Sequence, residues 1–73
     1  MTTHIFPLST TLEAAVYHDS QQRLQLDFRD GSRYVYSRVT PDLFCGFVAA
    51  NSKGRFFNQY IRVLPYRKTA PEL

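Results

Sequence analysis

Residues 23–36 read RLQLDFRDGSRYVY, and they carry the clearest structural signal in this chain of 73 residues. Apolar and polar residues alternate without a break over residues 23–29, which is typical of a β-strand with one buried face. Asp30 and Gly31 form a turn signal, and residues 32–39 return as a second strand. The stretch therefore predicts a β-hairpin, on which the rest of the predicted fold is built.

The length of the turn determines which side chains share a face of this hairpin. A two-residue turn would direct Tyr34 and Tyr36 toward the arginine-bearing face, whereas a three-residue loop places Gly31 in a left-handed bulge. The longer loop pairs Tyr34 with Leu26 and Tyr36 with Leu24. We favour it because it gathers the large apolar side chains on one face. It leaves the other face to polar and charged residues: Arg23, Gln25, Asp27, Arg29 and Arg33.

The residues on either side of the hairpin complete the predicted fold. Residues 12–17 alternate as an earlier strand, which gives an antiparallel meander of three strands. Thr40 and Pro41 signal the start of a first helix. Ser52 is the candidate cap of a second helix, which ends before Pro65. The sequence thus predicts an α+β fold, with a small three-stranded antiparallel meander followed by two short helices packed on one face.

A single domain is predicted over residues 9–68. Residues 1–8 are expected to be a flexible lead-in, residues 66–69 to be extended and basic, and residues 69–73 to be a C-terminal tail. The second helix should bury an apolar stripe, which consists of Phe56, Phe57, Tyr60, Ile61 and Leu64. Its other stripe is polar and consists of Arg55, Asn58, Gln59 and Arg62.

The composition excludes several classes of protein. With 44% hydrophobic and 21% charged residues, the chain is globular rather than disordered. The single cysteine, Cys45, excludes an intramolecular disulfide. No apolar run approaches the ~18 residues of a membrane span, and the N-terminus lacks the pattern of a secretory signal. We therefore expect a cytoplasmic protein with no membrane contact.

The net charge of +3 is distributed unevenly along the chain. Residues 1–42 carry four arginines and five acids. Residues 43–71 carry no acid and five cations, which are Lys53, Arg55, Arg62, Arg67 and Lys68. A C-terminal half of this kind favours an anionic partner, with RNA (tRNA included) ahead of an acidic protein surface. An ordinary solvated surface is the alternative.

The junction between the two predicted helices is a candidate anion site, because a helix N-terminus offers unpaired amides and a partial positive charge. Gly54 would let a phosphate approach the backbone closely. Lys53 and Arg55 would add charge, and Asn58 could donate its amide. The alternative is structural, with Ser52 as a cap and Gly54 at a tight corner between the helices. Asn58 would then bond to a neighbouring loop.

Tyr34 and Tyr36 are candidates for stacking on bases. In the register with the shorter turn they are exposed among arginines, as in platforms that bind single-stranded RNA. In the favoured register they are core residues whose hydroxyl groups reach the rim. Arg23, Arg29 and Arg33 are available for phosphates in either register. Their face could equally pair two copies of the chain into a homodimer.

Catalytic and metal-binding chemistry is not predicted. Cys45 is expected to be a small packing residue in the first helix, in apolar surroundings that favour the unreactive thiol. The two histidines, His4 and His18, do not belong to a ligand pattern of the kind that binds zinc. We expect no cofactor and no enzymatic activity.

Several short motifs follow one another in a recognisable order. The first half contributes residues 9–12, Tyr17, the Leu24-x-Leu26-x-Phe28 alternation, Gly31, the Tyr34-Val35-Tyr36 triplet and Val39. The second half contributes residues 50–58, which read ANSKGRFFN, followed by Ile61 and Pro65-Tyr66. This series, over residues 9–68, resembles the KTSC domain family. That family is named for a module at the C-terminus of some lysyl-tRNA synthetases, and it also occurs as free-standing bacterial and phage proteins.

The resemblance implies no enzymatic role, and the synthetase context implies RNA binding. The sequence therefore predicts a non-catalytic module that binds RNA through phosphate contacts of its basic C-terminal half. The predicted contact residues are Ser52, Lys53, Gly54, Arg55, Asn58, Arg62, Tyr66, Arg67 and Lys68. The alternative is a protein-interaction or sequestration module of phage or plasmid origin, with no role in nucleic-acid binding.

Overall fold

The structure is a computed structural model, and it describes residues 1–69 of the chain. These residues form five strands, two α-helices and one π-helical turn, η1, which continues the second helix. The strands are β1 (Thr2–Ile5), β2 (Leu12–His18), β3 (Arg23–Phe28), β4 (Arg33–Tyr36) and β5 (Tyr66–Thr69). The helical elements are α1 (Pro41–Ala49), α2 (Lys53–Phe56) and η1 (Phe57–Ile61).

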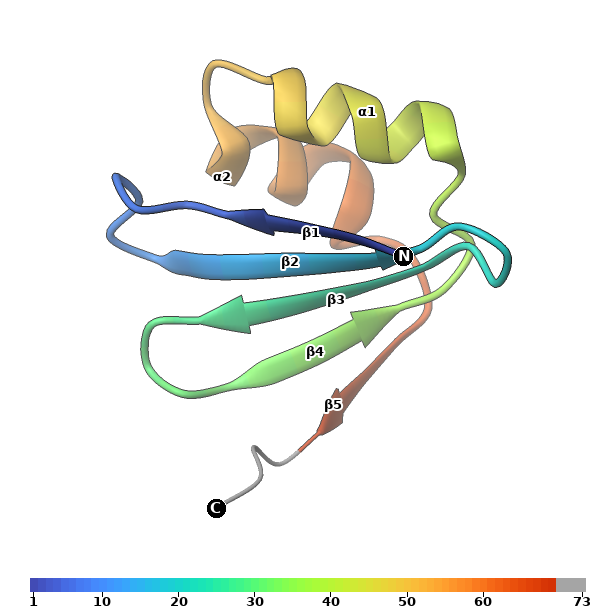
Figure 1. The fold of residues 1–73 in the computed structure, drawn as a ribbon, viewed down its shortest axis with the longest axis horizontal. Coiled ribbons are helices and arrows are strands. Elements are labelled where there is room, and N and C mark those ends of the chain that lie inside the picture. The colour runs from blue at the N-terminus through green and yellow to red at the C-terminus, as the bar shows by residue number, and fades with distance from the viewer. Residues whose placement is uncertain (70–73) are drawn as a thin grey trace.

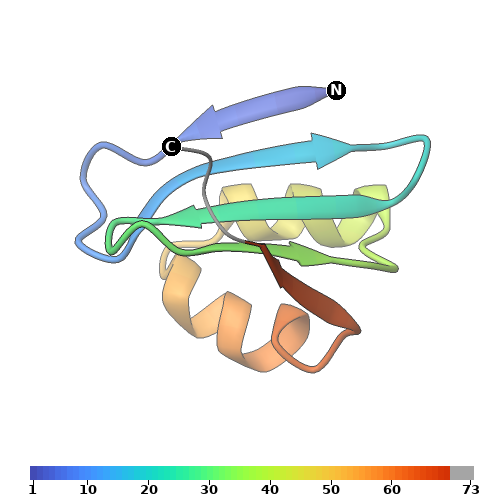
Figure 2. The same cartoon turned by 90° about the horizontal axis from the view of Figure 1, so that it is seen from below.

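The five strands described form one antiparallel sheet in which each strand pairs with its neighbours in the sequence, in the order β1-β2-β3-β4-β5. All helical elements lie on one side of this sheet (Figures 1 and 2). The predicted α+β class, with helices on one face, is therefore confirmed. The other face of the sheet has no helix over it among the described residues.

The predicted number of strands is wrong, because two further segments pair with the edges of the meander. Residues 2–5, expected to be a flexible lead-in, form β1 and pair with β2. Residues 66–69, expected to be an extended tail, form β5 and pair with β4. Each strand has only four residues and gains its stability from pairing with its neighbour, which local alternation does not reveal. Residues 70–73 of the predicted tail lie outside the described residues.

The favoured hairpin register is confirmed. Leu24 faces Tyr36 and Leu26 faces Tyr34 across the two strands. The loop is closed by hydrogen bonds between Phe28 and the residues that follow it, and Gly31 has a φ of +92°. This left-handed backbone is accessible to glycine at little cost and strained for other residues.

The core lies between the helices and the inner face of the sheet. The large side chains that are fully buried there are Leu24, Leu26, Val39, Phe47 and Ile61. Phe56, Phe57 and Leu64 pack against this core from the second helical segment and the turn after it. The predicted apolar stripe of that segment is thus largely confirmed, although Tyr60 remains 48% exposed.

A buried tyrosine ties strand β2 to the chain that enters the first helix. The Tyr17 hydroxyl donates a hydrogen bond of 2.6 Å to the Val39 carbonyl, and its ring stacks on Phe44 with centroids 4.4 Å apart. Burial raises the pKa of Tyr17, with smaller contributions from Asp19 and Cys45. The polar tip of this side chain is therefore satisfied inside the protein.

Both predicted helix caps are present. Thr40 caps α1 by accepting a hydrogen bond from the Leu43 amide, and Pro41 occupies the first turn. Ser52 caps α2 by accepting from the Arg55 amide at 3.3 Å. These side chains satisfy amides that the first turn of a helix leaves without partners, so the local sequence sets where each helix begins.

The close approach expected at Gly54 occurs at Gly46 instead. A Cβ atom added at Gly54 would meet nothing within 4 Å, so the interpretation of Gly54 as a tight corner is wrong. A Cβ atom at Gly46 would lie 3.0 Å from the ring of Phe56. Gly46 therefore lets helix α1 pack closely against the second helical segment.

Substitution of Gly31 tests the hairpin geometry, and substitution of Gly54 is its comparison. Gly31→Ala should lower the free energy of unfolding by ~1–2 kcal/mol, because a Cβ atom is strained in the left-handed region. Gly54→Ala, in helix α2 with open space around it, should be neutral or raise it by up to ~1 kcal/mol. Urea titrations of both variants provide the comparison. Equal stabilities of the two variants would contradict the role assigned to Gly31.

Candidate functional site

Strand β5 extends the inner face of the sheet with two residues that the sequence predicted to be functional. Tyr66 pairs with Tyr36, and Lys68 pairs with Tyr34. Because paired residues of neighbouring strands point to the same face, these four side chains share the side of the sheet that the helices cover. Tyr66 and Lys68 are nevertheless exposed, so the helices do not cover this corner.

A cleft of about 470 Å³ opens at this corner, between the sheet and the end of the second helical segment. It is lined by Tyr34, Tyr36, Phe57, Arg62 and Tyr66. Four of these five residues were singled out from the sequence, two as stacking residues and two as anion-binding residues. The structure thus brings together candidates that lie up to 32 positions apart in the chain, at 34 and 66.

The three tyrosines of the cleft contact one another. The ring centroid of Tyr66 lies 5.8 Å from that of Tyr34 and 5.5 Å from that of Tyr36, and the Tyr34 and Tyr36 centroids are 6.3 Å apart. Phe57 meets Tyr36 edge-on at 5.4 Å, and Phe28 meets Tyr34 edge-on at 5.6 Å. These aromatic contacts hold the rings in fixed orientations.

Two cations border this aromatic cluster. The Lys68 ammonium lies over the Tyr34 ring, 5.7 Å from its centroid, and Arg62 lines the cleft. Asp30 balances part of the Lys68 charge, since its pKa is lowered first by hydrogen bonds from Ser32 and then by Lys68. Among the described residues, none that line the cleft is acidic. The cleft therefore combines aromatic surface with net positive charge.

Tyr36 forms the floor of the cleft and is only 4% exposed. The pKa of Tyr36 is raised to about 12, first by burial and then by the neighbouring Tyr34 and Tyr66, while Arg62 acts in the opposite direction. Unlike that of Tyr17, its hydroxyl makes no hydrogen bond to any residue within positions 1–69. No side-chain oxygen among the described residues is both fully buried and without a partner, so the Tyr36 hydroxyl is accessible from the cleft.

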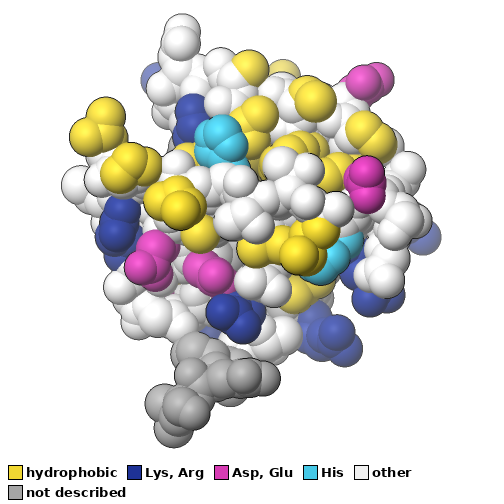
Figure 3. All heavy atoms as spheres, viewed as in Figure 1, with side chains coloured by type: hydrophobic (Ala, Val, Ile, Leu, Met, Phe, Trp, Pro, Cys, Tyr) yellow, Lys and Arg dark blue, Asp and Glu magenta, His cyan; other side chains and the backbone are white. Residues whose placement is uncertain are grey.

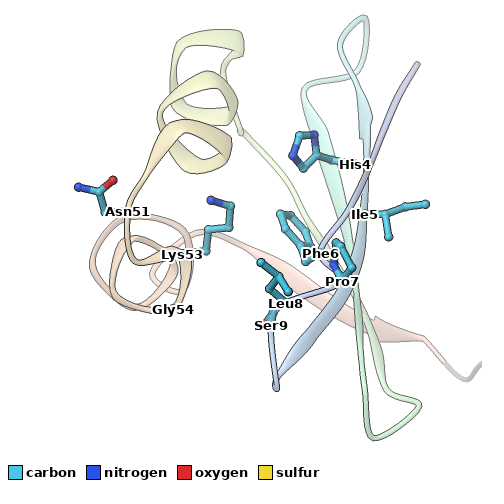
Figure 4. A pocket seen from close by; sticks show the side chains of 9 residues that line it. All are labelled: His4, Ile5, Phe6, Pro7, Leu8, Ser9, Asn51, Lys53 and Gly54. Carbon is cyan, nitrogen blue, oxygen red and sulfur yellow. The ribbon is translucent and has the colours of Figure 1, made fainter.

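The predicted anion site at residues 52–55 lies elsewhere on the molecule. The Lys53 ammonium donates a hydrogen bond of 2.9 Å to the Ala50 carbonyl, where it caps the end of α1. Lys53 also borders a second cleft, of about 490 Å³, with Phe6 and Leu8 across from it (Figure 4). Asn51, which belongs to the same cleft, points away from it (Figure 4). Asn58 lines a third cleft, beside Phe28 and Phe57.

The five cations of the C-terminal half therefore do not form one surface. Arg62 and Lys68 adjoin the tyrosine cleft, and Lys53 caps a helix. Arg55 lies near Tyr60, and Arg67 pairs with Val35 on the uncovered face. On the side seen in Figure 3, the Lys and Arg side chains are spread around the rim rather than gathered in one band.

The hairpin arginines expected to be available for phosphates are mostly engaged within the protein. Arg29 donates hydrogen bonds to the carbonyls of Ser9 and Phe6, which pin the loop between β1 and β2. Arg33 forms an ion pair with Asp27, with 2.7 Å between Nε and the carboxylate. The expectation that all three arginines are available is therefore wrong. Arg23 is exposed and lines a small cleft with Arg67.

Cys45 is exposed on helix α1, so its predicted packing role is wrong. The buried residues of α1 are Phe44 and Phe47, on either side of the exposed cysteine, and Leu43 and Val48 pack against the core as partly buried residues. No group of three or more His, Cys, Asp or Glu side chains within residues 1–69 is placed to hold a metal ion. In the same part of the chain, no helix has the length and hydrophobicity to cross a membrane.

Comparison with known families agrees with this fold. The KTSC domain profile matches residues 8–64. The chain belongs to the KTSC domain family. The crystal structure of a KTSC domain protein from Yersinia pestis has a TM-score of 0.81 and 28% identity to this KTSC domain. The match covers 94% of this chain and 100% of that one.

Two further relatives match most of this KTSC domain. A protein of Tsukamurella paurometabola is 41% identical over 54 residues, which is 74% of this chain and 81% of the relative. An uncharacterised protein of Stutzerimonas stutzeri is 36% identical over 59 residues, which is 81% of this chain and 83% of the relative. The family resemblance read from the sequence is thereby confirmed.

Sequence reasoning missed the part that Phe57 plays in this KTSC domain. The helical stripe marked it as a core residue, and it is one, but its edge also walls the cleft beside Tyr36. The pairing of Tyr66 with Tyr36 was missed as well. Residues 66–69 read YRKT and show no alternation of apolar and polar residues, so local sequence gave no signal for this pairing.

The pKa of Tyr36 makes stability depend on alkaline pH. The raised pKa means that the folded state favours the neutral phenol, so this contribution is complete below pH 10 and is lost as the pH rises toward 12. The Tyr36→Phe variant lacks this phenol, so its free energy of unfolding should fall less than that of wild type as the pH rises from 10 to 12. The raised pKa of Tyr17 contributes to the alkaline loss in both proteins. Urea titrations at several alkaline pH values measure the effect.

Tyr60→Phe is the matched control, because Tyr60 is 48% exposed on η1 and lies outside the cleft. It should follow the wild-type curve. An alkaline loss in Tyr36→Phe as large as that of wild type would contradict the assignment of a buried, neutral phenol at this position.

Proposed function

We propose that this KTSC domain is a non-catalytic module that binds single-stranded RNA, with the tyrosine cleft as its contact site. The supporting observation is the convergence of three tyrosines, Arg62 and Lys68 at one corner of the sheet. Proteins that bind single strands combine aromatic rings, on which bases stack, with cations that contact the phosphates. The cleft has both components within one small site.

The geometry favours a single strand over a duplex. A duplex presents its phosphates and grooves to a protein, and its bases are stacked on one another. The cations of the described residues are divided among separate clefts, so they do not offer the extended basic surface that a duplex would contact. An aromatic cleft instead suits a base that is already unpaired.

Salt dependence is the first test of this proposal. Binding of a labelled oligouridylate should weaken as salt rises, with a log–log slope of about −1.4 if two phosphates are contacted. Fluorescence anisotropy at several salt concentrations measures the slope. The absence of binding at low salt would contradict the proposal and would favour the alternative, a protein-interaction module.

Charge-removal variants test the location of the contact. Arg62→Gln with Lys68→Gln should reduce the affinity at low salt and bring the slope close to zero, because both phosphate contacts are lost. Arg55→Gln is the matched control, since Arg55 is exposed but lines a different cleft. If Arg55→Gln weakens binding as much as the double variant does, the contact site has been assigned to the wrong surface.

A further inference from the structure

The tyrosine cleft has room for one small ligand. Its volume of about 470 Å³ lies within the ~300–1,000 Å³ that is usual for small-molecule sites. A site of this size holds one unit of a polymer rather than a stretch of it. The identity of that unit deepens the proposed function and rests on it only for the identification of RNA as the polymer.

The three tyrosines differ in how much ring surface they offer. Tyr36 is 4% exposed and contacts the rings of both other tyrosines, so it offers little free ring surface. Tyr34 is half-buried, with Phe28 at its edge and the Lys68 ammonium over its face. Tyr66 is 60% exposed and is held in place by both of the other tyrosines. Tyr66 is therefore the ring on which a planar group can stack, whereas the sequence alone pointed to Tyr34 and Tyr36.

The charges select the kind of planar group. Clusters of tyrosines also bind methylated ammonium groups, because the ring faces attract cations. Here the Lys68 ammonium already lies over one of the rings, and Arg62 borders the cleft. A second cation would be repelled by both. A planar group that carries a negative charge fits the site, since stacking and charge attraction then act together.

The Tyr36 hydroxyl supplies a polar contact at the floor of the cleft. A buried tyrosine usually has a hydrogen-bond partner, and Tyr17 in this protein has one. The Tyr36 side chain is buried to a similar degree, but its hydroxyl has no partner among residues 1–69 and is accessible from the cleft. A polar atom of a ligand would provide that partner. The Tyr36 hydroxyl is thus available to form a hydrogen bond with a polar group that enters the cleft.

We infer that the cleft binds one unpaired nucleotide. Its base stacks on Tyr66 and forms a hydrogen bond with the Tyr36 hydroxyl, and its phosphate contacts Arg62 and Lys68. A nucleobase meets each of the three requirements, because it is planar, has polar edges and is linked to a phosphate. In this arrangement Tyr34 and Phe57 are walls that fix the positions of Tyr66 and Tyr36.

A titration with small probes tests this inference directly. AMP and UMP should shift the amide NMR signals of Tyr34, Tyr36, Arg62 and Tyr66, and adenosine should do so more weakly. Inorganic phosphate alone should bind at least about ten-fold more weakly than AMP, because stacking contributes ~1–3 kcal/mol per base. Equal effects of AMP and phosphate, or no shift in the cleft, would overturn the inference.

Variants of the tyrosines provide a second test. Tyr66→Ala and Tyr66→Leu should each weaken AMP binding about ten-fold or more, and the leucine retains the bulk that strand β5 needs. Tyr36→Phe should weaken it about 2- to 10-fold, because it removes one hydrogen bond and keeps the ring. Tyr60→Ala, at an exposed tyrosine outside the cleft, is the matched control and should leave AMP binding unchanged.

The two proposals fail in distinguishable ways. If the oligouridylate binds and the Tyr66 variants bind it as well as wild type does, the one-nucleotide cleft is wrong while the proposed RNA binding stands. If AMP binds in the cleft but the oligouridylate does not bind, the cleft is correct and RNA is the wrong polymer.

Discussion

The pairing of strands β3 and β4 is the constraint on which the other features of this protein depend. It is set by the three-residue loop, in which Gly31 has a φ of +92°. A shift of one residue would exchange the two faces of β4. In the observed register, Leu24 and Leu26 lie on the helix side together with Tyr36 and Tyr34. The same register therefore builds both the core and the floor of the cleft.

The cleft exists because the sheet is wider than the helices that cover it. Residues 66–69 return after Pro65 and add β5 beyond β4, so Tyr66 lies on the inner face without a helix above it. The resulting corner is lined by aromatic rings that are packed on one side and accessible on the other. This aromatic surface, bordered by cations, is the feature on which the proposed RNA binding rests.

Much of the fold could be predicted from local patterns. The alternation of residues 23–29, the glycine of the turn and the caps Thr40 and Ser52 act within a few residues, and each was correctly interpreted. Strands β1 and β5 could not be predicted in the same way, because their stability comes from pairing with distant segments. The close contact at Gly46 likewise depends on the ring of Phe56, on another helix. Membership of the KTSC domain family was correctly inferred because its motifs are local.

The candidate site could likewise be predicted only in part, because its residues are recognisable in the sequence but their proximity is not. Tyr34, Tyr36, Arg62, Tyr66 and Lys68 were all selected from the sequence, but composition gave no indication that they meet while Lys53, Arg55 and Arg67 lie apart. Summed charge is a property of the chain, whereas an interface depends on register and on strand order.

An NMR titration of the whole protein with an oligouridylate shows whether the tyrosine cleft is the surface that contacts RNA. Amide signals around Tyr34, Arg62 and Tyr66 are expected to shift. Shifts confined to the uncovered face around Val16 and Val35 would contradict the assignment of the cleft.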